Sequence, residues 1–147
     1  MHAPNNNRGR IDLPEVTTAI ARLTRLRADL VEVHYFPGCT LSTIALAEVA
    51  RARRELMGAH PYAMLSVLPP DVDFELNAMN VDHLREDREE GLLLAIAVVV
   101  SANMIEMVRK LYFSYYPWLR RILVTDKMDE ARGWIEDQSR NSDGTRA

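Results

Sequence analysis

The sequence predicts a single-domain α/β protein with a mixed, mostly parallel sheet of roughly five strands and with about four helices. The strongest indication is Gly91–Val100, an uncharged run that ends in three consecutive valines. Such a run is typical of a strand buried on both faces, in a sheet covered by helices. In addition, strand-like and helix-like segments alternate along the chain, and a length of 147 residues suits one domain.

The first two elements are predicted to form an antiparallel hairpin. Apolar and polar residues alternate in Leu30–Phe36, as on a half-buried strand. The apolar residues of Thr17–Arg27 nearly fit a helical spacing as well, but its threonines and its position before a clear strand favour an edge strand. A turn at Ala28 and Asp29 would join the two strands.

A helix and a second buried strand are expected next. The helix is predicted at Leu41–Met57, where Thr40 can cap its start and Gly58 can end it. The strand Tyr62–Leu68 follows and is closed by two prolines. A helix followed by a strand is expected three times along the chain, and this is the first.

The second half continues the alternation. We expect Asp71 or Asp73 to cap one helix, and Asn103 with Glu106 to form a capping box on another. The predicted elements are helix Phe74–Asp87, strand Gly91–Val100, helix Met104–Tyr116, strand Leu119–Thr125 and helix Lys127–Gln138. The order β-β-α-β-α-β-α-β-α implies parallel pairs with right-handed crossovers and one antiparallel edge hairpin. Segments 1–15 and 139–147 are predicted to be flexible tails of a domain spanning 16–138.

Composition and charge exclude several classes of protein. A formal net charge of −3 gives no general attraction to nucleic acid or to an anionic membrane. The apolar run ends at Ile105, which is too short for a membrane-spanning helix, so no membrane insertion is expected. Met1–Arg10 has no apolar segment typical of a secretory signal. Cys39 is the only cysteine, which excludes an intramolecular disulfide and suits the cytoplasm.

Candidate catalytic and metal-binding residues are few. Cys39 precedes a predicted helix and lies near His34 in sequence, but the chain supplies no recognisable triad. His83 and Asp87 are four residues apart on a predicted helix, which is half of a metal site, and no second pair completes it. No glycine-rich phosphate-binding loop is present. We therefore expect no catalytic residue, no metal, no cofactor and no nucleic-acid partner.

The helix predicted at Met104–Tyr116 has more apolar surface than one sheet contact requires. One stripe suffices to cover the sheet, yet a second stripe of apolar and aromatic side chains lies beside it. Four explanations are open: a homodimer interface, which we favour, an interface with another protein, a pocket wall for a lipid or other small molecule, or cover by another part of the chain. The candidate interface or pocket residues are Ile105, Met107, Tyr112, Phe113, Tyr116 and Trp118.

Two segments resemble a known family. The order of elements, the sequence VHYFPG at Val33–Gly38 and the sequence YPWLRRILVTDKMDEARGWI at Tyr116–Ile135 resemble small STAS-like proteins. These are bacterial relatives, in fold, of the anti-sigma-factor antagonist domain, and most have no assigned activity. In typical STAS antagonists a kinase phosphorylates a Ser or Thr at the start of the second main helix. The matching segment here, Leu68–Phe74, contains neither residue, so no phosphorylation site is expected.

Together these observations predict a non-enzymatic interaction or regulatory module of the bacterial cytoplasm, homodimeric through the aromatic helix 104–116. The alternative is a protein that binds a small apolar ligand or a lipid in a pocket beside that helix.

Overall fold

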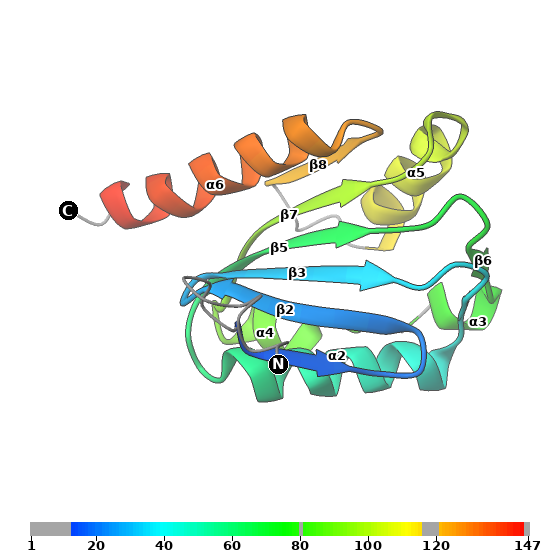
Figure 1. Ribbon diagram of the computed structural model, residues 1–147, viewed down its shortest axis with the longest axis horizontal. Helices are drawn as coiled ribbons and strands as arrows, with labels where there is room; N and C mark the ends of the chain where they lie inside the picture. Colours follow the sequence, from blue (N-terminus) through cyan, green and yellow to red (C-terminus); the bar gives the residue numbers. More distant parts are fainter. Residues whose placement is uncertain (1–12, 80, 116–120, 146–147) are drawn as a thin grey trace, which may run out of the picture.

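The computed structural model describes residues 13–79, 81–115 and 121–145. The elements in chain order are β1 (Glu15–Thr17), β2 (Ala21–Arg27), β3 (Leu30–Tyr35), β4 (Thr40–Leu41), α2 (Thr43–Met57), β5 (Tyr62–Val67), β6 (Asp73–Phe74), α3 (Leu76–Met79), α4 (Arg85–Glu89), β7 (Leu93–Val99), a 3₁₀ turn (Ala102–Met104), α5 (Ile105–Tyr115), β8 (Ile122–Thr125) and α6 (Met128–Thr145) (Figure 1).

The main sheet confirms the predicted α/β class and the mostly parallel arrangement. Its strand order is β1-β2-β3-β5-β7-β8, so six strands replace the five expected. The strands β3, β5, β7 and β8 are parallel, whereas β1, β2 and β3 pair antiparallel. Arg27 pairs with Leu30 around a turn at Ala28 and Asp29, which confirms the predicted hairpin.

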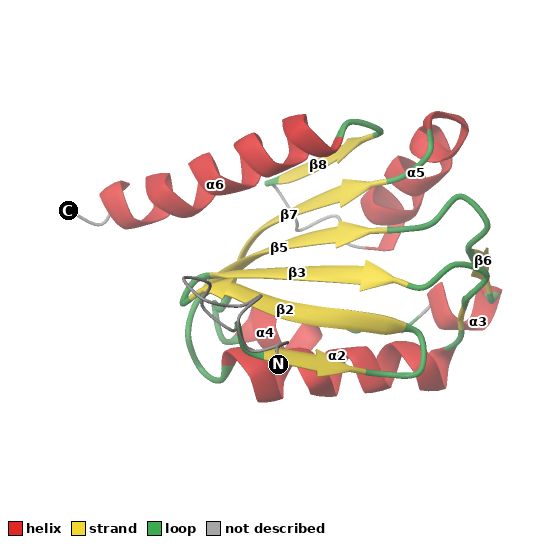
Figure 2. Ribbon diagram, in the orientation of Figure 1, coloured by secondary structure: helices red, strands yellow, loops and turns green. Residues whose placement is uncertain are grey.

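The helices cover the two faces of the sheet unequally. The strand order advances in one direction from β3 to β8, and right-handed crossovers then place every connecting helix on the same face. One core accordingly joins Val49 of α2 and Val108 of α5 to sheet residues such as Val98. On the opposite face, Ala131 and Ile135 of α6 pack against a second core. Figure 2 shows α6 and α2 with the strands between them.

The strand β7 is buried on both faces, as its sequence predicts. Ile96 and Val98 belong to the core beneath α2 and α5, while Ala95, Ala97 and Val99 belong to the core beneath α6. Alanines on the α6 side let the helix backbone approach the strand closely, because their side chains are short.

The predicted helix Phe74–Asp87 is wrong. The structure has the short strand β6 here, followed by the two short helices α3 and α4. Pairing with β4 keeps this backbone extended, since Asp73 N donates to Cys39 O at 3.0 Å and Glu75 N donates to Leu41 O at 3.2 Å. A long-range strand pair therefore overrides the local helical spacing.

Three predicted helix boundaries also need correction. Thr40 lies in β4, and the cap of α2 is Ser42, whose Oγ accepts a hydrogen bond from Ala45 N at 3.1 Å. The capping box at Asn103 is wrong because that residue lies inside the 3₁₀ turn before α5. The terminal helix ends at Thr145 rather than Gln138, so helical structure reaches into the segment predicted to be a tail. The remaining tail residues, 1–12 and 146–147, lie outside the described residues.

Candidate functional site

A pocket of about 100 Å³ lies between α2, α5 and the sheet. It is situated toward the carboxyl ends of the parallel strands, whose arrowheads in Figure 1 point toward β6, α3 and α5. In open α/β sheets this edge is the usual place for a ligand. The walls are formed by Tyr35, Leu41, Leu46, Val49, Arg53, Met64, Ser66, Leu68, Phe74, His83, Leu84, Val98, Val108, Leu111 and Tyr112.

The hollow results from how the crossover helices are spaced. The helix α2 contacts β1 and β2 at one side of the sheet, and α5 contacts β8 at the other. Between them the connection from β5 to β7 contributes only the short helices α3 and α4, where a longer helix would have covered the central strands. Space therefore remains over the middle of this face.

The pocket walls are mostly apolar. Val49, Met64, Val98 and Val108 are buried members of the surrounding core, and Phe74 and Leu111 are half-buried at the pocket. Such a surface favours apolar groups, because a ligand there removes its own apolar area from water.

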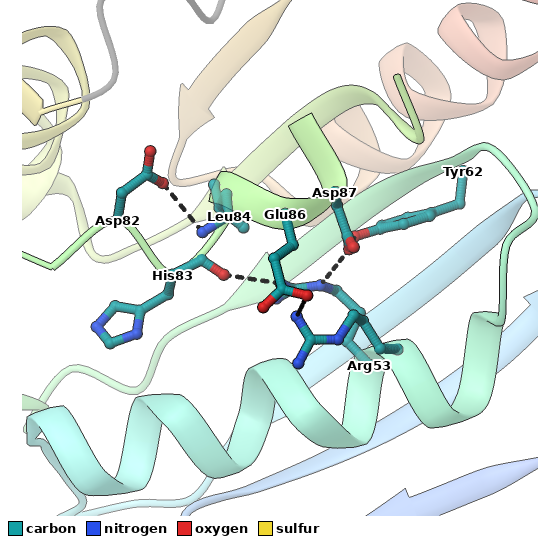
Figure 3. Close-up of polar contacts among 8 residues, drawn as sticks. Arg53, Tyr62, Asp82, His83, Leu84, Glu86 and Asp87 are labelled. Atoms are coloured by element: carbon teal, nitrogen blue, oxygen red, sulfur yellow. Dashed lines mark hydrogen bonds and ion pairs between the residues drawn. The ribbon is translucent and has the colours of Figure 1, made fainter. Parts of the chain in front are cut away.

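A buried polar cluster lies beside the pocket and ties α4 to α2 (Figure 3). The Arg53 Nε donates to Asp87 Oδ2 at 3.2 Å, and another guanidinium nitrogen donates to His83 O at 3.0 Å. The Tyr62 hydroxyl donates to the same Asp87 oxygen. The side chains of Arg53 and Asp87 are only 4% and 2% exposed, so each charge depends on the other for compensation.

Burial and the Asp87 carboxylate determine the protonation of the cluster. Burial raises the pKa of the Tyr62 hydroxyl, and its hydrogen bond to Asp87 raises the pKa further. The hydroxyl therefore remains a donor at neutral pH. Burial lowers the pKa of His83, so its imidazole is neutral at pH 7, and its Nε2 lies 3.2 Å from the Ala78 carbonyl oxygen as a donor.

One buried polar atom beside the pocket, Asp87 Oδ1, has no hydrogen-bond partner among the described residues. The pocket wall also includes Ser66, a hydroxyl-bearing residue that is only 4% exposed. Buried polar groups are normally paired, so unpaired ones mark places where a ligand or water can bind.

The predicted interface residues are divided between core and surface. Ile105 and Tyr112 are half-buried and pack against the core, and Tyr112 also lines the pocket. Met107 is 43% exposed. The side chain of Phe113, and all of Tyr116 and Trp118, lie outside the described residues.

Sequence reasoning missed Arg53 and assigned Asp87 only to an incomplete metal site with His83. The burial of Arg53 could have been predicted, because Arg53 lies at helical spacing from the buried residues Val49, Ala52 and Met57 of α2. The burial of Asp87 had no such signal, since it lies in the charged run Asp82–Glu90, whose composition is typical of an exposed helix end.

The structure argues against a reactive cysteine. Cys39 is buried, and burial together with the charge of Asp71 raises the pKa of its thiol. A nucleophilic thiol requires the opposite shift. His34 is engaged elsewhere, with its Nε2 2.8 Å from Glu32 Oε1.

The pair of His34 and Glu32 belongs to a separate polar cluster on the α6 side of the sheet. Arg132 Nε of α6 lies 3.3 Å from Glu32 Oε2. Burial raises the pKa of Glu32, but the hydrogen bond to His34 and the charge of Arg132 outweigh it and hold the pKa below its usual range. The carboxylate is thus paired, and it ties α6 to β3.

Within the described part of the chain, no group of three or more His, Cys, Asp or Glu residues is placed to hold a metal ion. The helices of that same part include none that is long and apolar enough to cross a bilayer.

Comparison with known proteins supports the fold alone. No protein-family model matches the sequence, and no curated protein matches it. Among solved structures, the chain is similar to an uncharacterized protein of the DUF3478 family from Shewanella loihica PV-4, which has a SpoIIAA-like fold. The TM-score is 0.52 at 12% sequence identity, over 84% of this chain and 92% of that chain. The chain therefore has the STAS-like fold that its sequence resemblance predicts.

Proposed function

We propose that this protein is a non-enzymatic module that binds the apolar part of a small molecule in the pocket between α2, α5 and the sheet. The observation that supports this most directly is the apolar hollow of about 100 Å³ near the carboxyl ends of the parallel strands. The STAS-like fold agrees with the proposal, since such domains typically bind rather than catalyse.

The volume limits the size of the bound group. A closed apolar cavity of about 150 Å³ accommodates benzene, so this smaller pocket of about 100 Å³ encloses a short alkyl chain or most of one ring, with the rest of the ligand outside. Burying six carbons contributes about 5 kcal/mol before the cost of association. We therefore expect dissociation constants of about 1 mM for fragment-sized probes.

Toluene is a suitable probe. Titration into the full-length protein, followed by amide NMR shifts, should give saturable changes at Ser66, Val98 and Leu111 with a dissociation constant of about 1 mM. Leu111→Trp should abolish them, because the larger side chain fills the pocket that Leu111 lines.

The matched control is Met107→Trp. It adds the same side chain to the same helix at a position that is 43% exposed, so toluene binding should persist. Linear shifts without saturation in the unmodified protein, or equal loss in both variants, would contradict the proposal.

A homodimer through α5 is a second candidate, favoured by the exposure of Met107 on that helix. Sedimentation at micromolar concentrations should then give twice the monomer mass of 16.8 kDa, and Met107→Glu should restore the monomer. A monomer at every concentration would exclude this candidate and leave the pocket proposal standing.

A further inference from the structure

We infer that the ligand of this pocket is uncharged and has a hydrogen-bond acceptor, such as the carbonyl of a ketone, ester or amide, that binds the Ser66 hydroxyl. This inference rests on the proposed function and adds the chemical class of the ligand.

The position of Ser66 is the first reason. Tyr62, Met64 and Ser66 alternate along β5 toward the face beneath α2 and α5, so Ser66 is directed to the same side as the pocket. Its neighbours in the sheet, Val33 and Val98, are apolar and offer no side-chain partner. A hydroxyl in such surroundings gains a hydrogen bond when an acceptor enters, and loses its access to water without one when a hydrocarbon enters.

The charge balance at the pocket is the second reason. Arg53 is the only permanently charged residue among the lining residues of the described chain, and its charge is compensated by Asp87 at 3.2 Å. His83 is neutral at pH 7 because burial lowers its pKa. An anionic ligand would lose its hydration without gaining a free countercharge, and a cationic ligand would add a second positive charge beside Arg53.

The hydrogen-bonding capacity of Arg53 strengthens the preference for an acceptor. A guanidinium has five N–H donors, and two of its nitrogens bind Asp87 and His83 O. The remaining donors belong to a residue that lines the pocket. The pocket wall thus contains donor-bearing side chains on Ser66 and Arg53, which favours an acceptor on the ligand.

Three probes of nearly equal shape test the inference: acetophenone, α-methylstyrene and benzoate. In the full-length protein at pH 7, acetophenone should bind with a lower dissociation constant than benzoate by at least about tenfold. Ser66→Ala should weaken acetophenone about 3- to 10-fold and leave α-methylstyrene unchanged or slightly tighter, because only the carbonyl accepts from the hydroxyl.

Ser66→Cys is the second variant, which keeps a side chain of similar size with a weaker donor. Its affinity for acetophenone should lie between that of the unmodified protein and that of Ser66→Ala, and its affinity for α-methylstyrene should not change. Tightest binding by benzoate, or equal effects of Ser66→Ala on acetophenone and α-methylstyrene, would overturn the inference while leaving the apolar pocket intact. Failure of all three probes together with toluene would overturn the proposed function itself.

Discussion

Replacing Asp87 with alanine should lower the free energy of unfolding by about 3–5 kcal/mol. The variant leaves the Arg53 guanidinium buried at 4% side-chain exposure without its countercharge. It also removes the acceptor of the Tyr62 hydroxyl. Urea denaturation should show a lower midpoint at an unchanged slope, because the surface exposed on unfolding is nearly the same.

A double variant separates the charge effect from packing. Arg53→Met combined with Asp87→Leu removes both charges and should be more stable than Asp87→Ala, because neither side chain then leaves an unpaired charge. Glu86→Ala is the surface control. Its partner Arg54 is 2.9 Å away, but Glu86 is 65% exposed, so the expected loss is at most about 1 kcal/mol. A similar small loss in Asp87→Ala would show that the buried pair contributes little.

Ile135→Ala should destabilise the protein by about 2–5 kcal/mol. Ile135 is one of the most deeply buried side chains and joins Ala131 in packing α6 against the sheet. The small alanines beneath it cannot fill the space that the substitution leaves, so a cavity remains. Thermal or urea unfolding measures the loss.

The control lies in the same helix. Gly133 is exposed, and a Cβ built there meets no atom within 4 Å. Gly133→Ala should stabilise the protein by about 0.5–1 kcal/mol, because alanine restricts the unfolded backbone and favours helix. An Ile135→Ala variant as stable as the unmodified protein would mean that α6 is not anchored to the sheet as described.

Elements with strong local patterns were predictable from the sequence. The valine-rich strand β7 and the alternating strand β3 have periodicities that admit few other structures, and the α/β class follows from them. The strand β6, which replaces the start of the predicted helix, was not predictable, because it depends on the pairing of Asp73 with Thr40, which are far apart in the chain. Local spacing contains no information about that contact.

The candidate site was predictable only in part. The surplus of aromatic residues on α5 identified Tyr112, which the structure places at the pocket. The hollow itself depends on the distance between α2 and α5 across the sheet, which no single segment encodes. The pairing of Arg53 with Asp87 depends on where α4 lies, so no local pattern indicated that these two residues would meet.

The placement of α6 has a consequence for biosynthesis. Because every strand of the sheet precedes α6 in the chain, a ribosome delivers the whole sheet before the helix that shields Leu65 and Ala97. The helices α2 and α5 can cover their face of the sheet during translation. The opposite face remains exposed to solvent until the α6 segment has left the exit tunnel. During this interval the apolar face of the sheet is exposed in the nascent chain, where it can bind chaperones or aggregate with other chains.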